Sequence, residues 1–238
     1  MADPASVGSF GNPSCYASRV KLARPVSHVI FDLDGVLLDT EPLYTRATQE
    51  VISPYGKTFD WSIKGDMIGR SSLDGAHHLV RTLGLPLLPE EYLARRKPLL
   101  DALFPTAPEI PGARALVDRL HARGVPLGVA TSSEQALYRA KTTRHDWFGV
   151  FRAVVCGDDP RIGALKPAPD IFLITARDLG AAPQDCLVFE DSLAGVEAAR
   201  AAGMQVVALP DPHMDRARYA ADLLIDAYGE LDLADLGL

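Results

Sequence analysis

Short apolar runs alternate with amphipathic helical patterns along this chain, and this alternation restricts the possible folds more than any other feature. Runs as long as buried strands occur at 28–32, 125–130, 153–156, 186–189 and 205–209. Helical periodicity lies between them, ending before Gly124, Gly180 and Gly203. Strands that are apolar throughout are typical of a parallel sheet covered by helices on both faces. We therefore predict an α/β fold with a Rossmann-like three-layer core.

The first two apolar runs are separated by about 90 residues, far more than one crossover helix requires. Helical patterns at 44–52, 71–83 and 89–104 occupy this gap. We predict a small α-helical cap domain inserted after the first strand. The predicted divisions are a cap at 45–108 and a core at 28–44 and 109–238.

The charge, the cysteines and the N-terminal segment limit the surroundings and partners of the protein. The net charge is −7, and an acidic chain repels nucleic acid and anionic membrane surfaces. Three scattered cysteines indicate a reducing compartment, and no apolar run approaches the ~18 residues of a membrane span. Residues 1–27 lack the apolar core of a secretory signal and are predicted to be a disordered tail. We expect a cytoplasmic protein, a monomer or weak dimer, without nucleic-acid or membrane partners.

Polar residues gather where the predicted strands end, and the usual nucleotide-binding, serine-hydrolase and zinc-protease motifs are absent. The strand-end residues are Asp32, Asp34, Thr131, Ser132, Glu190 and Asp191, and Lys166 joins them from the segment before the helical pattern that begins at Asp170. Ligands of parallel sheets bind at the carboxyl ends of the strands, so these side chains are expected to converge. Crowded carboxylates need a neutralising cation, and oxygen ligands without His or Cys favour Mg²⁺ over zinc.

This ordered set resembles the haloacid dehalogenase-like hydrolases over residues 28 to about 225. The segment Asp32-Leu33-Asp34-Gly35-Val36-Leu37 is similar to the first motif of that family, Thr131 to the second, Lys166 to the third and Glu190-Asp191 to the fourth. The resemblance implies that Asp32 is a nucleophile that forms an aspartyl-phosphate. It implies that Asp34 protonates the leaving oxygen and then activates water.

The same resemblance implies a cofactor and a substrate class. Mg²⁺ would be held by Asp32, Asp191 and the backbone carbonyl of Asp34, with Glu190 tuning Asp191 or reaching the metal through water. Thr131, the Ser132 amide and Lys166 would bind the phosphate oxygens of a small phosphorylated metabolite. Those family members that remove halide lack the acid at the position of Asp34, so its presence favours phosphate.

Further segments resemble the branch of the family that contains pseudouridine-5′-phosphatases and glycerol-3-phosphatases. They are 104–106, 141–145, 157–160 and 166–170. The expected substrate is a phosphorylated sugar, polyol or nucleoside. A phosphomutase of the β-phosphoglucomutase type is the main alternative, although His77-His78 in the cap shows no clear match to it. A non-catalytic binding protein is a third possibility, which the intact motif set disfavours.

Other residues receive more ordinary expectations. Arg70 is predicted to contact the substrate from the cap, and Glu41 and Tyr44 to face the cavity. The six histidines show no metal-ligand spacing, Cys156 and Cys186 are predicted to be small buried hydrophobes, and Trp61 and Trp147 to pack. The clusters at 90–91 and 95–97 are predicted to be solvated helix faces.

Overall fold

A six-stranded parallel sheet forms the centre of the protein in a computed structural model that describes residues 22–67 and 72–238. The strand order is β3-β2-β1-β4-β5-β6. The strands are β1 (His28–Phe31), β2 (Leu127–Thr131), β3 (Ala153–Cys156), β4 (Cys186–Glu190), β5 (Gln205–Ala208) and β6 (Leu223–Leu224). The predicted parallel α/β fold is confirmed. Strand β6 escaped prediction because two residues are too few to show a pattern.

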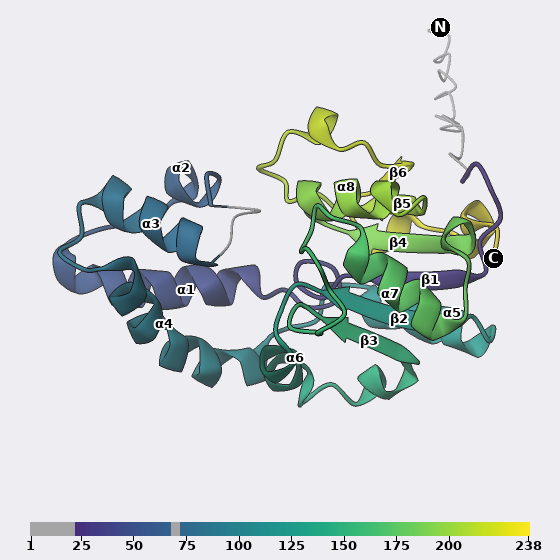
Figure 1. Cartoon of the computed structure of the whole chain (residues 1–238), viewed down its shortest axis with the longest axis horizontal. Helices are drawn as coiled ribbons and strands as arrows, with labels where there is room; N and C mark the ends of the chain where they lie inside the picture. Colours follow the sequence, from purple (N-terminus) through teal and green to yellow (C-terminus); the bar gives the residue numbers. More distant parts are fainter. Residues whose placement is uncertain (1–21, 68–71) are drawn as a thin grey trace, which may run out of the picture.

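Successive side chains of each strand point to opposite faces of the sheet, and helices cover both faces. Val29 and Phe31 pack on the side of α5 (Ala113–Ala122). Ile30 packs on the opposite side, where α7 (Asp170–Leu179) and α8 (Leu193–Ala201) lie. The sheet and its two helical layers are visible in Figure 1. This burial on both faces explains why the strands are apolar without alternation.

Four further helices form a separate group that follows β1 (Figure 1). They are α1 (Glu41–Ile52), α2 (Trp61–Lys64), α3 (Ser72–Leu83) and α4 (Pro89–Leu103). Buried Ile52, Leu79 and Tyr92 give this group its own apolar cluster. Helix α1 begins three residues earlier than predicted, so the predicted division between residues 44 and 45 falls inside it. The one-turn helix α2 was not predicted.

The chain returns to the sheet through the 3₁₀ turn η2 (Phe104–Thr106), which packs against α6 (Gln135–Thr142). Helix α6 follows β2 and was not predicted from its periodicity. Leu137 and Ala140 of α6 pack against Phe104. These contacts bring a core helix to the place where the helical group joins the sheet.

The predicted disordered tail is wrong at its C-terminal end. Residues 1–21 lie outside the described part of the chain, but Val26 is 6% exposed and belongs to the core. The Arg24 amide donates to Gln205 Oε1 at 3.0 Å, and the Ser27 amide donates to the Asp185 carbonyl at 2.9 Å. Residues 24–27 are therefore anchored along the sheet. Among the described helices, none is long and apolar enough to cross a membrane.

Candidate active site

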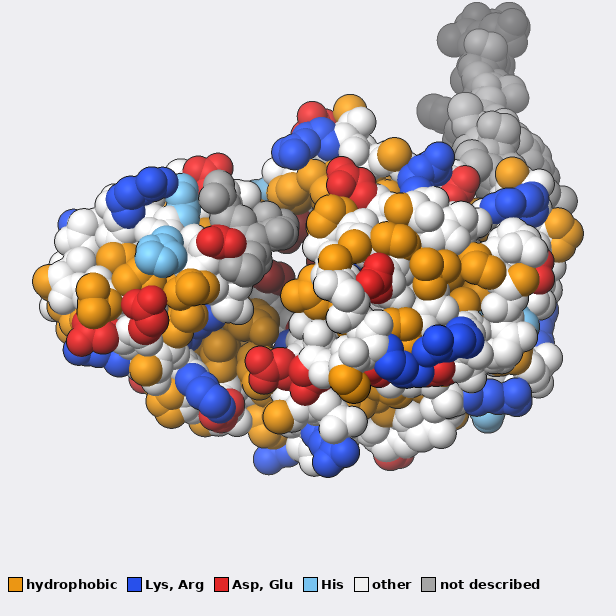
Figure 2. Space-filling view, viewed as in Figure 1, with side chains coloured by type: hydrophobic (Ala, Val, Ile, Leu, Met, Phe, Trp, Pro, Cys, Tyr) orange, Lys and Arg blue, Asp and Glu red, His pale blue; other side chains and the backbone are white. Residues whose placement is uncertain are grey.

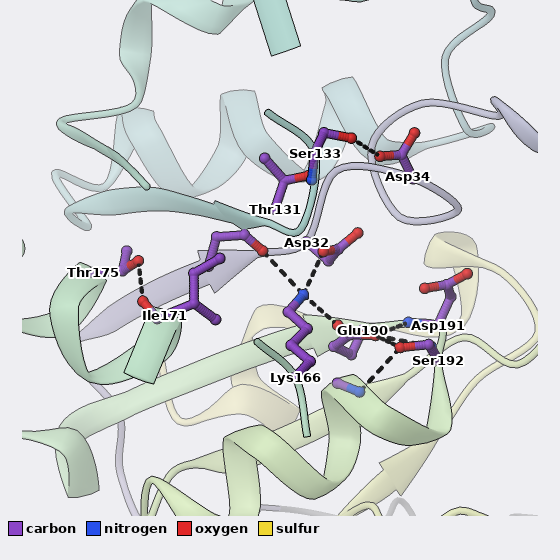
Figure 3. Close-up of polar contacts among 12 residues, drawn as sticks. Asp32, Asp34, Thr131, Ser133, Lys166, Ile171, Thr175, Glu190, Asp191 and Ser192 are labelled. Carbon is purple, nitrogen blue, oxygen red and sulfur yellow. Dashed lines mark hydrogen bonds and ion pairs between the residues drawn. The ribbon is translucent and has the colours of Figure 1, made fainter. Parts of the chain in front are cut away.

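Lys166 lies at the centre of the site and connects two carboxylates at the ends of neighbouring strands (Figure 3). Its Nζ atom lies 2.5 Å from Asp32 Oδ1 and 2.7 Å from Glu190 Oε1, and it donates to the Ala130 carbonyl at 3.1 Å. Burial by itself would lower the pKa of Lys166. The charges and hydrogen bonds of Asp32 and Glu190 outweigh burial and raise that pKa, so the ammonium stays charged.

Asp32 follows β1 directly and is nearly buried, with 9% of its side chain exposed. Burial raises its pKa to about 7, because the loss of water outweighs the attraction of Lys166, while Glu190 and Asp34 add repulsion. A carboxylate must be ionised to act as a nucleophile. A further cation beside Asp32 would favour the ionised carboxylate, the form that could act as a nucleophile.

Glu190 ends β4 and ties Lys166 to the loop that follows. Its Oε2 atom accepts from the amides of Asp191 and Ser192, each at 2.8 Å, and from Ser192 Oγ at 3.0 Å. A Cβ atom at Gly195 would lie 1.7 Å from Glu190 Oε1, so α8 can approach only because this residue is glycine. Both carboxylate oxygens are thus engaged by protein donors.

The carboxylate of Asp191 lies against the backbone of Gly35, where an added Cβ atom would come 2.2 Å from Oδ2. Burial raises the pKa of Asp191 well above its ordinary value, and Glu190 and Asp32 add repulsion. Within the described residues no hydrogen-bond donor contacts this carboxylate, so its charge has no partner of its own. A half-buried carboxylate without a donor is stabilised by a cation beside it.

The donor set fits Mg²⁺. No three His, Cys, Asp or Glu side chains among the described residues are grouped so that they alone could hold a metal ion. Mg²⁺ does not require such a cage, because it is usually held by one or two carboxylates together with water and substrate phosphate. Asp32 and Asp191 supply two such carboxylates. Burial and the neighbouring negative charges raise the pKa of both, so that a cation beside them would stabilise their ionised forms.

Asp34 has a different environment, because three donors hold its carboxylate. Thr40 Oγ1 and Lys141 Nζ donate to Oδ1 at 2.5 and 2.6 Å, and Ser133 Oγ donates to Oδ2 at 2.9 Å. Burial would raise the pKa of Asp34, but the charge of Lys141 and these hydrogen bonds lower it below the usual value. Lys141 and these hydrogen bonds therefore lower the pKa of Asp34, whereas burial raises the pKa values of Asp32 and Asp191.

Thr131, the last residue of β2, and Ser132, the first residue after it, line the cavity together with these carboxylates. Thr131 Oγ1 accepts from the Ser133 amide at 3.0 Å, and Ser132 lines the cavity. The Gly157 amide donates to the Ser133 carbonyl at 2.9 Å, and a Cβ atom at Gly157 would lie 2.3 Å from the Ser132 carbonyl oxygen. The glycine of the 157–160 segment therefore lets the loop after β3 pack closely against the loop after β2.

A cavity of about 420 Å³ lies between the strand ends and the four-helix group. Its lining includes Asp32, Asp34, Thr131, Ser132, Lys166, Glu190 and Asp191 from the sheet side. Glu41, Tyr44 and Arg96 line it from the helical side, as predicted for the first two. Figure 2 shows the surface hollowed between these two parts, with acidic side chains beside the hollow. The volume lies within the range of small-molecule sites.

Arg96 corrects one prediction, since it is not a solvated side chain. It is half-buried and donates to Tyr92 Oη at 3.1 Å, and its guanidinium lies 5.7 Å from the Tyr44 ring. Its neighbour Lys97 is 70% exposed, as predicted. Arg70 lies outside the described residues. Nothing in the pattern of 95–97 distinguishes the inward residue from the outward ones.

The remaining predictions concern the cysteines and the tryptophans. Cys156 and Cys186 are buried free thiols, as predicted. Trp147 is buried, and the ring of Trp61 in α2 stacks on that of His213 at 4.2 Å, so both tryptophans pack. His213 belongs to the segment after β5, so this stack joins the helical group to the core.

Three side chains that donate to Asp34 were missed from the sequence: Thr40, Ser133 and Lys141. Ser133 follows the predicted Thr131–Ser132 pair by one position and could have been included with it. Lys141 stood only in the 141–145 segment quoted for the resemblance, and the segment by itself does not indicate that this lysine is buried against Asp34.

The cavity lies at the carboxyl ends of parallel strands and is lined by acids, hydroxyls and an ammonium group. This arrangement is typical of an α/β enzyme. The sequence model of the haloacid dehalogenase-like hydrolases matches residues 26–203. The chain belongs to this family of hydrolases, and the resemblance inferred from its four motifs is confirmed.

Individual relatives support the same assignment. A protein of Arabidopsis thaliana named (DL)-glycerol-3-phosphatase 2 is 41% identical, with 90% of this chain and 92% of that protein covered. A probable pseudouridine-5′-phosphatase of Drosophila melanogaster is 44% identical, with 82% and 87% covered. The crystal structure of a putative beta-phosphoglucomutase from Thermotoga maritima superposes with a TM-score of 0.75 at 30% identity, covering 90% of this chain and all of that one.

Proposed function

We propose that this protein is a Mg²⁺-dependent phosphatase that hydrolyses a small phosphorylated metabolite through an aspartyl-phosphate on Asp32. The observation that carries the proposal is the Lys166 ammonium between Asp32 and Glu190, with Asp34 and Asp191 beside it. Positive charge next to a carboxylate nucleophile is what an incoming phosphate group requires. The names of the relatives support phosphate esters as substrates.

In the first proposed step, an Asp32 oxygen attacks phosphorus while the bond from phosphorus to the leaving oxygen breaks. The anionic phosphate bound beside Asp34 raises the pKa of that carboxyl, so that Asp34 takes up a proton and donates it to the leaving oxygen, and the alcohol departs. Lys166, the Thr131 hydroxyl and the Ser132 amide bind the phosphate oxygens. This step divides a difficult hydrolysis into two easier displacements.

In the second proposed step, water attacks the phosphorus of the phosphoryl group on Asp32. Asp34 takes a proton from that water, the bond from phosphorus to Asp32 breaks, and inorganic phosphate leaves. Asp34 thus alternates between acid and base, and the hydrogen bonds from Thr40 and Ser133 keep its carboxylate close to the end of β1.

Asp32, Asp191 and the backbone carbonyl of Asp34 would hold Mg²⁺, and Glu190 would contribute through water because its oxygens already accept from Lys166 and from backbone amides. When bound, the ion would offset the repulsion between the phosphate and the acidic side chains. The raised pKa values of Asp32 and Asp191 support this assignment.

The expected substrate is a sugar, polyol or nucleoside monophosphate, such as glycerol 3-phosphate or pseudouridine 5′-phosphate. The cavity has the size of a small-molecule site, and the relatives with these names cover most of the chain. Arg96 would contact the part of the substrate remote from the phosphate, and we retain Arg70 as a further contact. We expect the enzyme to act in the cytoplasm as a monomer or weak dimer.

A panel of phosphorylated metabolites incubated with Mg²⁺ tests the proposal by release of inorganic phosphate. We expect turnover that stops with EDTA and returns with added Mg²⁺. Asp32→Asn removes the nucleophile at nearly constant volume and is expected to abolish turnover. Asp118→Asn is the matched control, because Asp118 is exposed on α5 and its one ion pair among the described residues is with the neighbouring Arg114. Undiminished turnover by Asp32→Asn would exclude the aspartyl-phosphate route.

A sugar phosphomutase is the second candidate, because the Thermotoga maritima structure with the fold of this chain bears the name of a putative beta-phosphoglucomutase. Such an enzyme would return the phosphoryl group from Asp32 to a sugar hydroxyl instead of water. Incubation with a hexose 1-phosphate distinguishes the two, since a mutase forms the 6-phosphate and a phosphatase releases inorganic phosphate.

A further inference from the structure

The most buried charged side chain of the helix α6 is Lys141, whose side chain has no exposed surface. Lysine is almost never fully buried unless it is paired. Its Nζ atom donates to Asp34 Oδ1 at 2.6 Å, to Ser133 Oγ at 2.9 Å and to Tyr44 Oη at 3.3 Å. Two of these contacts reach the acid that the proposed reaction uses twice, one directly and one through the Ser133 hydroxyl, which itself donates to Asp34.

The Lys141 ammonium also contacts two aromatic rings, one from each of the two segments that connect the sheet to the helical group. Nζ lies 4.7 Å from the centre of the Phe104 ring and 5.3 Å from that of Tyr44. Tyr44 belongs to α1, where the chain leaves the sheet, and Phe104 begins η2, where it returns. The two rings also contact each other edge-on, with centres 5.4 Å apart. The position of Lys141 is thus set by packing as well as by charge.

The contacts of Lys141 complete the set of donors around Asp34. Thr40 approaches Oδ1 from the β1 loop, and Ser133 approaches Oδ2 from the β2 loop. Lys141 bonds both to Oδ1 and to the Ser133 hydroxyl, so it links the donors of the two oxygens. Among the described residues it is the only charged group bonded to Asp34. A carboxylate held at both oxygens is restricted in position and in rotation.

We propose that Lys141 is a positioning residue that holds the Asp34 carboxylate in the orientation needed to take a proton from the attacking water. The inference rests on the proposed function and adds a residue outside the four family motifs. Without Lys141, the carboxylate loses its one charged donor and gains freedom to rotate. Water attack on the phosphoryl group of Asp32, which breaks the bond from phosphorus to that residue, should then become slow.

The test uses the full-length chain, Mg²⁺ and 4-nitrophenyl phosphate, whose leaving group departs without a proton from Asp34. Formation of the phosphoenzyme should therefore remain fast in Lys141→Met while its hydrolysis slows. We expect a burst of 4-nitrophenol approaching one equivalent per active site, a protein mass increase of one phosphoryl group after acid quench, and a fall in kcat of at least about tenfold. Lys141→Arg keeps the charge and should restore part of kcat and reduce the burst.

Lys97→Met is the matched control, since Lys97 is exposed and pairs with Asp101 on the same helix, remote from Asp34. It should show the kinetics of the unsubstituted protein. Lys141→Gln, which removes the charge but keeps a donor, replaces Lys141→Met if that variant does not fold. Burst amplitude counts only active molecules, so partial unfolding does not imitate the expected result.

The possible outcomes separate this inference from the proposed function. The role of Lys141 is refuted if kcat and kcat/KM of Lys141→Met fall by the same factor and no phosphoenzyme accumulates. It is also refuted if the kinetics of Lys141→Met do not change. If the unsubstituted protein and Asp32→Asn are equally inactive or equally active on phosphate esters, the proposed function itself fails.

Discussion

Replacing Gly35 by alanine tests whether the Asp191 carboxylate lies as close to the backbone of Gly35 as the structure shows. Gly35 has a φ of +76° and an added Cβ atom would lie 2.2 Å from Asp191 Oδ2. Gly203, after α8, has a φ of +79° and nothing within 4 Å of its added Cβ atom. The two substitutions therefore impose the same backbone conformation on alanine, and only Gly35→Ala also displaces a carboxylate of the site.

The expected magnitudes separate these two effects. A left-handed conformation costs a residue with a Cβ atom about 1–2 kcal/mol, so both variants should lose about this much free energy of unfolding. Cβ atoms essentially never approach other heavy atoms within 3.0 Å, so Asp191 must retreat from 2.2 to 3.0 Å or beyond, a shift of at least about 0.8 Å. A misplacement of about 1 Å can reduce the rate about 10²-fold, which corresponds to about 2.7 kcal/mol of activation free energy.

The measurements are urea unfolding and the Mg²⁺ dependence of phosphate release. Gly203→Ala should be destabilised but keep kcat/KM, whereas Gly35→Ala should lose about 10²-fold in kcat/KM and require more Mg²⁺ for half-maximal activity. If both variants lose stability equally and both retain activity, Asp191 is not held where the structure places it. If both lose activity equally, the loss follows from backbone strain and the argument is refuted.

Two further predictions concern the cap and the buried thiols. Arg96→Met should raise KM about tenfold or more with little change in kcat, because it removes a charged donor remote from the reacting phosphate. The control Lys97→Met should change neither constant. Equal effects of the two substitutions would contradict the inward position of Arg96. A Cys15→Ser variant keeps two thiols, Cys156 and Cys186. Burial raises the pKa of Cys156 to about 11 and that of Cys186 to about 12. The variant should therefore react slowly with a thiol reagent at neutral pH and rapidly once unfolded in urea. Fast labelling of the native variant would show that these two thiols are accessible.

The linear pattern is sufficient for the strands β1 to β5 and for the acids at the edge of the sheet. A strand such as 186–189 must be apolar throughout because it is buried on both faces, and a parallel strand must present the residue after it at the ligand-binding edge. The sequence is therefore enough to predict that Asp32, Thr131 and Glu190 lie at the same edge of the sheet. The order of the family motifs then supplied their proposed roles, which periodicity alone cannot supply.

The sequence did not reveal which helical side chains point into the site. Lys141 lies 107 positions from Asp34, and its helix shows an ordinary mixture of polar and apolar residues. Arg96 stands among other basic residues of α4, and only the packing of that helix against α1 turns it inward. Local pattern encodes which face of an element is buried and where the element ends. The approach of two distant helices depends on how all the side chains between them fill space, so only the tertiary structure decides which charges meet.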